Sequence, residues 1–476
     1  MMDRLASRHL AALPADVEQP GYDRAEVATG IVHLGIGAFH RAHQAAYFNQ
    51  LIAIGDPRWG IVGVSMRSST VADQLNPQDG LYTLVNRAPS GETLSIIGAV
   101  KQVLVCGQDT LAILRLIADP AVQIVSLTVT EKGYCHDPAT GELRNDHNDI
   151  VHDLALPGDP RSAIGLLAEG LDARRAAGAG PLTILSCDNL PDNGKLLAGL
   201  VLDFAQCRSA DLAAWIADNV SFPCTMIDRI VPATKDADRD ALAARLGVRD
   251  EAMVKAEPFT QWVVEDHFAG ARPPLDQVGV RIVDDVRPFE LAKLRMLNGS
   301  HSLIAYTGLL RGHVTVDAAI ADPFIRSLVD RLMVEAAATL PAVPGLDPAD
   351  YAQQLIDRFA NPALDHRLAQ IAMDGSQKLP QRLIGTIADQ LRNGAQADAS
   401  ATGVAAWLLH LNGPFLDDPL ATPLRELADK ADGGVVDLVR RACRFAPVFG
   451  DVGRNPAFVD LLCRSAVRLS QMVERA

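Results

Sequence analysis

Residues 31–40 read I-V-H-L-G-I-G-A-F-H, and this stretch decides the fold of the N-terminal half. Residues 31–34 predict a buried strand, and a helical pattern follows the glycines. In a dinucleotide-binding turn, the first glycine makes the turn and the second lets backbone N–H groups approach a pyrophosphate. The third glycine of the usual fingerprint is replaced by His40. We therefore predict a cofactor-binding turn formed by Gly35, Gly37, Ala38 and Phe39.

Short apolar runs and helical patterns alternate through the first half of the chain, which predicts parallel βαβ units. The other strands expected in this arrangement are 60–65, 124–130 and 182–186. Segments 82–85 and 95–103 predict additional strands, antiparallel and inserted between the second and third parallel ones. The N-terminal fold is therefore predicted to be a Rossmann-type α/β domain with added antiparallel strands.

The pattern changes after about residue 285, where strand-like runs nearly vanish and apolar residues recur with a helical period. The predicted helical segments are 288–310, 323–338, 348–359, 380–393, 401–411 and 455–474. We therefore predict two domains: a dinucleotide-binding domain at 1–285 and a mainly α-helical substrate-binding and catalytic domain at 286–476.

The composition narrows the class of protein. The chain has 476 residues, which is too long for one ordinary hydrophobic core. It carries 44 basic and 58 acidic residues, a formal net charge of −14, which argues against binding to nucleic acid or to an anionic membrane. No apolar run reaches the length of a membrane span, and the N-terminus lacks a signal-peptide core. We expect a cytoplasmic enzyme of small molecules, monomeric by default.

The seven cysteines are scattered and include no C-x-x-C pair. This pattern argues against a disulfide framework and against a zinc site, so we expect reduced thiols and no metal.

The residues after the second predicted strand bear on the choice of cofactor. A carboxylate at this place would bind the ribose hydroxyl of NAD, but the sequence here is S-M-R-S-S at 65–69. Arg67 and Ser68 could instead accept the 2′-phosphate of NADP. The alternative is that Arg67 stacks on adenine or points to solvent. The sequence thus favours some use of NADP beside NAD.

Residues 293–301, K-L-R-M-L-N-G-S-H, combine polar groups with an apolar helical run. On an α-helix, with about 100° per residue, Asn298 lies about 140° and His301 about 80° from Lys293, so all three fit one broad face. Burial would lower the pKa of Lys293 toward the range of a general base. The amide and imidazole would bind an alcohol or carbonyl oxygen. The alternative is a lysine that reaches solvent while Asn298 and His301 satisfy backbone groups.

These motifs resemble one known family. The turn G-I-G-A-F-H-R-A-H-Q at 35–44 is similar to that of the polyol-specific long-chain dehydrogenases, which run G-x-G-x-F-H-R-A-H. Later motifs resemble the same family in the same order: T-V-T-E-K-G-Y (128–134), S-C-D-N-L (186–190), F-P-C-T-M-I-D-R-I (222–230), Q-W-V-V-E-D (261–266), K-L-R-M-L-N-G-S-H (293–301) and D-G-S-Q-K-L-P (374–380). The resemblance covers nearly the whole chain.

The resemblance implies a metal-independent, NAD(P)-dependent secondary-alcohol dehydrogenase. It implies that Lys293 is the general base, and that Asn298, His301 and Asn189 complete the catalytic group. It further implies two kinds of supporting residue: Asp228 and Lys378 for substrate binding, and Glu131 and Glu290 on a proton path.

The family includes mannitol 2-dehydrogenase and fructuronate reductase, and the substrate stays open between these two types. The leading expectation is interconversion of a hexitol and a ketose at C2. The alternative is reduction of a hexuronate, for which Lys378 and Arg382 are the candidate cations. Some mannitol enzymes carry an arginine eight residues before the position of Lys378, where this chain has Gln370. A nucleotide-sensing protein without catalysis is a third, less favoured alternative.

Overall fold

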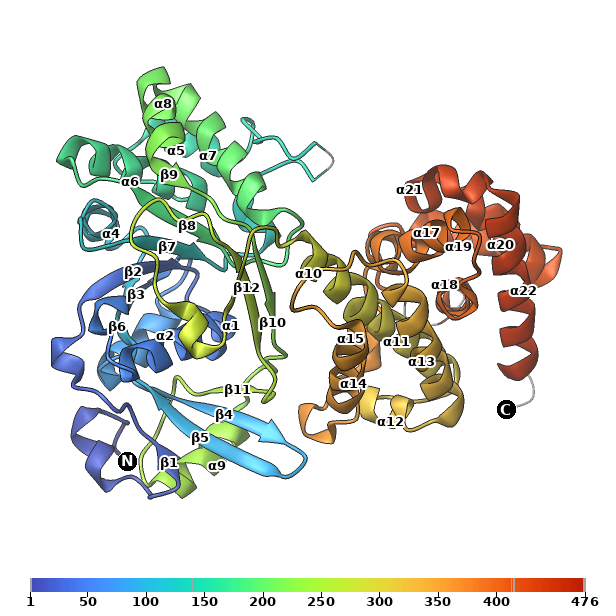
Figure 1. Cartoon of the computed structure of the whole chain (residues 1–476), viewed down its shortest axis with the longest axis horizontal. Coiled ribbons are helices and arrows are strands. Elements are labelled where there is room, and N and C mark those ends of the chain that lie inside the picture. Colours follow the sequence, from blue (N-terminus) through green and yellow to red (C-terminus); the bar gives the residue numbers. More distant parts are fainter. Residues whose placement is uncertain (1, 139, 412, 414–415, 474–476) are drawn as a thin grey trace. The chain divides into compact units, whose positions relative to one another are not determined.

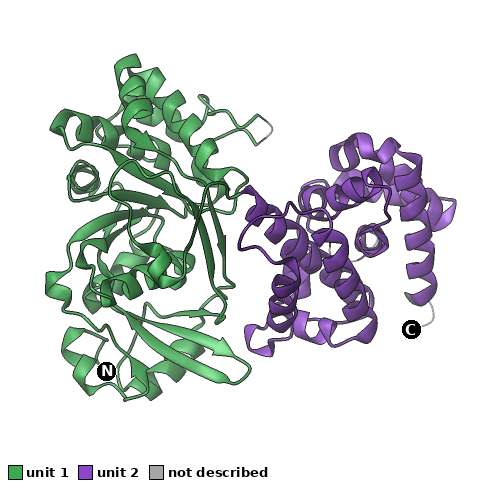
Figure 2. Cartoon of the chain, viewed as in Figure 1, with its two compact units in different colours: residues 1–286 green, residues 287–476 purple. Residues whose placement is uncertain are grey.

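The chain was analysed as a computed structural model that describes residues 2–138, 140–411, 413 and 416–473. Contacts divide it into two compact units, Met1–Val286 (unit 1) and Arg287–Ala476 (unit 2), which Figure 2 shows in separate colours.

Unit 1 is built on a six-stranded parallel sheet (Figure 1). Its strands, in order across the sheet, are β6 (Val100–Val105), β3 (Gly60–Ser65), β2 (Thr29–Leu34), β7 (Ile124–Leu127), β8 (Leu182–Ser186) and β9 (Val220–Ser221). The chain winds outward from β2 in one direction and then, from β7, in the other. This is the order of the dinucleotide-binding fold, whose ligand site lies where the winding reverses.

Helices cover both faces of this sheet because side chains alternate along each strand. In β2, Ile31 packs into a core shared with α2 (Gln44–Ala53). Val32 and Leu34 point into a second core, shared with α6 (Ala163–Ala177) and α7 (Asn193–Arg208). The predicted strand 31–34 is thus confirmed as buried on both sides.

Two smaller sheets complete unit 1. One has the order β1 (Val17–Glu18), β5 (Gly91–Ile97), β4 (Tyr82–Ala88) and β11 (Val254–Ala256); the other has β10 (Thr225–Asp228), β12 (Gln261–Glu265) and β13 (Arg281–Val283). The β4–β5 pair is antiparallel, as predicted.

Two predicted strands needed correction. The segment 95–103 is not one antiparallel strand, because the chain turns at Gly98, whose N–H donates to Asn49 Oδ1 (2.8 Å). Its second part belongs to β6, which pairs with β3 in parallel. The predicted strand 124–130 ends at Leu127. The Thr128 N–H still donates to the Leu34 carbonyl, but the Val129 and Thr130 N–H groups bind the Asp188 carboxylate instead of a neighbouring strand.

Unit 2 is mainly helical in its described residues, as predicted. Its longer helices are α11 (Gly299–Leu310), α13 (Pro323–Ala337), α14 (Pro348–Phe359), α17 (Gly385–Arg392), α18 (Asp398–His410), α19 (Ala421–Asp429), α20 (Gly434–Cys443) and α22 (Pro456–Val473). Residues 299–308 of α11 are all buried, so this helix forms the centre of the unit. Gly403 of α18 lets the two helices approach, because a side chain there would meet Leu303 and Leu383.

Two predicted helices are interrupted by π-helical turns. The first π-turn, Lys293–Asn298, separates α10 (Arg287–Ala292) from α11. The second π-turn, Pro380–Ile384, separates α16 (Gly375–Leu379) from α17. Proline has no N–H to donate, which accounts for a shift in hydrogen bonding at the second π-turn. The expectation of regular α-helix over 288–310 and 380–393 was therefore wrong in detail.

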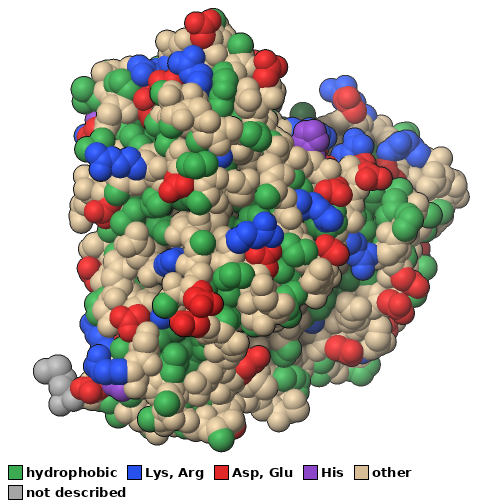
Figure 3. Space-filling view, turned by 60° about the vertical axis from the view of Figure 1, so that its left-hand side comes forward, with side chains coloured by type: hydrophobic (Ala, Val, Ile, Leu, Met, Phe, Trp, Pro, Cys, Tyr) green, Lys and Arg blue, Asp and Glu red, His purple; other side chains and the backbone are tan. Residues whose placement is uncertain are grey.

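The surface is mixed in charge. On the face drawn in Figure 3, acidic and basic side chains are interspersed and apolar side chains lie in small groups. The cysteines are all free. Among the described helices, none combines the length and apolar character needed to cross a bilayer.

Candidate active site

The turn after β2 has the geometry expected of a dinucleotide site. Gly35 adopts φ +90°, and a Cβ atom there would collide with the Thr128 carbonyl oxygen. Glycine is therefore required at this position. Gly37 precedes the first residue of the short helix α1 (Ala38–Ala42) and is exposed, with open space beside it.

A cavity of about 340 Å³ opens at this turn. It brings together four of the predicted cofactor residues, Gly35, Gly37, Arg67 and Ser68. The cradle that the glycines leave open fits the phosphates of a dinucleotide. The other two predicted residues, Ala38 and Phe39, do not line the cavity, and Phe39 instead packs on the His43 ring at 5.2 Å.

The cavity also contains residues that the sequence analysis missed. Lys132, Arg161 and Ser162 line it, and both cations are exposed. Together with Arg67 they give the cavity three cations, against one carboxylate, that of Asp149, among its described lining residues. Lys132 lies within the motif at 128–134 but received no role there, and Arg161 and Ser162 lie outside the motifs. The order of strands in the sheet brings the three residues together.

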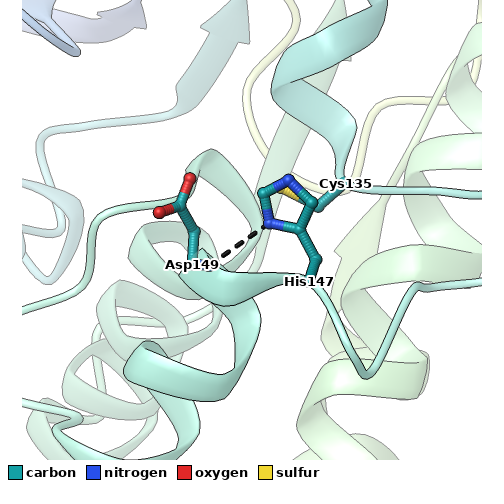
Figure 4. A group of neighbouring side chains, drawn as sticks. All are labelled: Cys135, His147 and Asp149. Carbon is teal, nitrogen blue, oxygen red and sulfur yellow. Dashed lines mark hydrogen bonds between the residues drawn. The ribbon is translucent and has the colours of Figure 1, made fainter.

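Figure 4 shows a group of three potential metal ligands beside this cavity: Cys135, His147 and Asp149. His147 caps helix α5 (Asn148–Ala155), and its Nδ1 accepts a hydrogen bond from the Asp149 N–H (3.2 Å). The Asp149 carboxylate is directed away from the imidazole ring (Figure 4). Burial raises the pKa of the Cys135 thiol to about 11, which disfavours the thiolate that a metal requires. We interpret the group as a helix cap.

The buried His33 is linked by hydrogen bonds to the turn after β2. The Thr128 hydroxyl donates to the Gly35 carbonyl (2.8 Å), and His33 Nε2 in turn donates to that hydroxyl oxygen (2.9 Å). His33 Nδ1 then accepts from Ser126 Oγ (2.8 Å). The ring also stacks on His40 with 3.4 Å between centroids. Burial lowers the pKa of His33 to about 3, so the ring is neutral and holds this chain of hydrogen bonds.

Three other predicted residues of unit 1 lie at the carboxyl ends of its strands. Glu131 begins a short 3₁₀ turn after β7 and is exposed. Asn189 lies three residues after β8 and is also exposed. Asp228 is the last residue of β10 and is buried.

In unit 2, the first π-turn aligns two of the predicted catalytic residues. A π-helix joins residue i to residue i+5, so Lys293 and Asn298 lie above one another on consecutive turns. They would be about 140° apart on a regular α-helix. His301 follows Asn298 by three residues on α11 and therefore continues the same row. Lys293 and Asn298 are half-buried. Glu290 is half-buried one turn earlier, on α10.

His301 is buried in a pocket of aromatic and cationic groups. Its ring lies 4.9 Å from Phe359 and 5.1 Å from His366 between centroids. Burial, with added repulsion from His366, Arg358 and Arg382, holds the pKa of His301 well below its usual value. Its Nε2 atom is buried and finds no hydrogen-bond partner among the described residues. A neutral imidazole with an unused nitrogen is suited to bind a hydroxyl group.

The second π-turn places Arg382 next to the first one. Arg382 Nη1 lies 3.2 Å from Ser302 Oγ and 3.5 Å from the Asn298 carbonyl oxygen. Burial lowers the pKa of Arg382 to about 10. Lys378, one turn earlier, donates to the Met373 carbonyl (2.6 Å) and lies 3.7 Å from Asp374. Unit 2 thus gathers Lys293, Asn298, His301 and Arg382.

Comparisons with known proteins bear out this architecture. Residues 29–277 match the Mannitol dehydrogenase Rossmann domain, and residues 285–469 match the Mannitol dehydrogenase C-terminal domain. The chain belongs to the mannitol dehydrogenase family. This confirms the resemblance that the sequence motifs indicated, and it identifies the chain as an oxidoreductase.

Relatives in the mannitol dehydrogenase family carry two kinds of name. The D-mannonate oxidoreductase of Escherichia coli (strain K12) is 42% identical, covering 95% of this chain and 97% of its own. A mannitol 2-dehydrogenase of Aspergillus fumigatus is 38% identical, covering 95% and 93%. The solved mannitol 2-dehydrogenase of Pseudomonas fluorescens, a ternary complex with NAD and D-mannitol, is 36% identical with a TM-score of 0.84 and covers 99% of both chains.

The neutral His33 predicts acid sensitivity. Its folded pKa of about 3 lies below the unfolded value of about 6.5, so the unfolded chain binds more protons between these limits. The free energy of unfolding should therefore fall by about 1.4 kcal/mol per pH unit from this group alone as the pH drops below about 6.5. Titration by NMR should find the His33 ring uncharged down to pH values near 5; a ring that titrates near 6.5 would contradict the assigned network.

Proposed function

We propose that this protein interconverts a secondary alcohol at C2 of a hexitol and the corresponding ketose, with NAD or NADP as cofactor and Lys293 as general base. The observation that carries the proposal is the row formed by Lys293, Asn298 and His301, in which the His301 Nε2 finds no hydrogen-bond partner within the part of the chain that the structure describes. The fit of the unit 1 cavity to a dinucleotide supports the cofactor. Relatives named mannitol 2-dehydrogenase support the substrate.

Each residue then has a defined chemical task. Lys293 in its neutral form takes the proton from the substrate hydroxyl. The bound dinucleotide supplies the hydride acceptor at its nicotinamide. Asn298 and Asn189 donate N–H groups to the oxygen as it gains charge, and these donors need no reorganisation during the reaction. His301 Nε2 binds a neighbouring hydroxyl and so orients the chain of the substrate.

The supporting residues follow from the same proposal. Glu290, one helical turn before Lys293, and Glu131 pass the proton toward water. Asp228 and Lys378 bind other hydroxyl groups of the substrate. No step in this scheme uses a metal ion. The free cysteines and the net charge of −14 suit a cytoplasmic enzyme, monomeric, acting on small molecules.

Replacement of Lys293 by alanine tests the general base. We expect kcat for alcohol oxidation to fall about a thousandfold, because general bases contribute about 10²–10⁴-fold. Cofactor binding, followed by fluorescence titration, should be unchanged. Small primary amines added to the variant should restore part of the activity. A variant that keeps more than about a tenth of the wild-type kcat at its best pH would exclude Lys293 as the base.

We propose that the enzyme accepts NADP as well as NAD. Arg67, Lys132 and Arg161 all line the cavity, and none of them forms an ion pair among the described residues. Cations of this kind would attract a 2′-phosphate through charge-assisted hydrogen bonds. Ser68 adds a hydroxyl at the same end of β3.

Substitutions at Arg67 test this preference. Arg67→Ala should raise KM for NADP by about tenfold, the effect of losing one charge-assisted hydrogen bond, and change KM for NAD much less. Arg67→Asp should shift the preference further to NAD, since its carboxylate repels a 2′-phosphate and can bind the ribose hydroxyl. Lys132→Ala is a companion variant with the same expected direction. Steady-state kinetics with both cofactors would measure these effects, and strict NAD use by the wild type would refute the proposal.

A second candidate function is the reduction of a hexuronate such as fructuronate. Arg382 favours it, because a guanidinium has five N–H donors, and the acceptors of this one among the described residues are the Ser302 hydroxyl and the Asn298 carbonyl. No carboxylate forms an ion pair with Arg382 among the described residues, although the residue is half-buried beside Asn298. A substrate carboxylate would fill that role. The relative named D-mannonate oxidoreductase supports the same candidate.

Arg382→Gln separates the two candidates. If the substrate is a sugar acid, this variant should lose about ten- to a hundredfold in kcat/KM for fructuronate, which corresponds to one charged hydrogen-bonded contact. Its kcat/KM for fructose should change far less. Equal losses on the charged and the uncharged substrate would mean that Arg382 supports the first π-turn and does not bind a carboxylate.

A further inference from the structure

Three predicted site residues of unit 1 lie on separate segments that meet in one buried polar network. Glu131 follows β7, Asn189 follows β8, and Asp228 ends β10. The residues that join these segments are Asp188 and Asn193, both buried, and neither was singled out by the sequence analysis.

Asp188 joins the segment after β8 to the segment after β7. Its Oδ1 accepts the Thr130 N–H (2.8 Å), and its Oδ2 accepts the Val129 N–H (3.1 Å) and the Tyr134 hydroxyl (2.9 Å). These three bonds bracket Glu131 in the sequence. Asp188 is also the immediate neighbour of Asn189. The Asp188 carboxylate therefore holds the beginnings of both segments, the one after β7 and the one after β8.

The Asp188 carboxylate also holds an unfavourable backbone. Thr130 has φ +65° and ψ 164°, a conformation that β-branched residues rarely adopt. Such a conformation is unfavourable and persists only where surrounding contacts impose it. The hydrogen bond from the Thr130 N–H to Asp188 is a contact of this kind. Because Thr130 directly precedes Glu131, its backbone conformation sets the direction in which the chain continues at Glu131.

Asn193 connects the same segment to β10. Its Nδ2 donates to the Asp188 carbonyl (3.0 Å) and to the Thr225 carbonyl (2.9 Å), while its Oδ1 accepts the Thr225 N–H (3.0 Å). The Thr225 hydroxyl donates to the Ser186 carbonyl at the end of β8 (2.6 Å). Thr225 begins the short strand that Asp228 ends, so its position determines that of Asp228.

We infer that Asp188 is a positioning residue, which together with Asn193 sets the mutual placement of Asn189, Glu131 and Asp228. This inference rests on the proposed function, in which those three residues serve the reaction. Asp188 does not itself touch the substrate. Its removal should therefore affect the reaction only through the residues that it holds.

A double-mutant cycle between Asp188 and Asn189 tests the inference. Asp188→Asn keeps the shape of the side chain but places an amide against N–H donors, and it should lower kcat about ten- to a hundredfold while KM for the cofactor changes less than about twofold. Asn189→Ala should lower kcat about a hundredfold or more if the amide stabilises the oxyanion. If Asp188 acts through Asn189, the double variant should lose little beyond Asn189→Ala.

The outcomes distinguish a failure of the positioning role from a failure of the proposed function. Additive losses, with Asn189→Ala strongly impaired, would overturn the positioning of Asn189 by Asp188 and leave the proposed function intact. A normal kcat in Asn189→Ala would instead overturn the proposed role of that amide. Tyr134→Phe removes one of the bonds to Asp188 and should cause a smaller loss in the same direction; it replaces Asp188→Asn in the cycle if that variant does not fold.

Two further variants exclude a loss of stability as the cause. Asp250 is a buried carboxylate of the same unit that accepts the Ala252 and Thr83 N–H groups. Asp250→Asn should lower the melting temperature and leave kcat unchanged, in contrast to Asp188→Asn. Thr130→Gly, added to Asp188→Asn, should restore part of kcat because glycine adopts positive φ without help. No restoration would contradict the coupling through Thr130.

Discussion

The Thr128 carbonyl oxygen occupies the space where a side chain at residue 35 would begin, and this close approach constrains unit 1. It presses the turn after β2 onto the segment after β7, at the place where the sheet reverses its winding. The Thr128 hydroxyl and the neutral His33 ring satisfy the polar groups that the approach buries. The backbone that lines the cavity at this turn is therefore held by hydrogen bonds, and exposed cations line the same cavity.

In unit 2, two π-turns determine where the polar side chains of the candidate site lie. A regular helix through residues 293–301 would spread its polar side chains over a broad face, whereas the first π-turn stacks Lys293 on Asn298. The second π-turn, next to it, brings Arg382 to the Asn298 carbonyl. The first π-turn leads directly into α11, so its chemical groups lie beside a helix whose residues 299–308 are all buried.

Much of this arrangement could be predicted from the sequence. Alternating apolar runs predicted the parallel strands, and the spacing of polar residues within a helical run predicted that Lys293, Asn298 and His301 share one face. The π-turns could not be predicted, because a shift from i+4 to i+5 bonding depends on tertiary packing that single-residue periodicity does not encode. Strand 124–130 was overextended for a similar reason, since the Asp188 carboxylate takes the N–H groups that a strand would have paired. The convergence of Arg67, Lys132 and Arg161 follows from sheet order, not from any local motif.

The first π-turn also bears on the number of residues that this helix contains. A π-turn contains one residue more than the α-helical turn it replaces, so deletion of a single residue between Lys293 and Asn298 would restore a regular helix. After such a deletion the segment could still form a helix, and its apolar residues would still recur with a helical period. The lysine and the amide would then be four residues apart on an α-helix, about 40° from one another around its axis, and would still lie on one face. In sequences related to this one, a one-residue gap between these two positions would therefore indicate a regular α-helix in place of the π-turn, with the lysine and the amide still on one face.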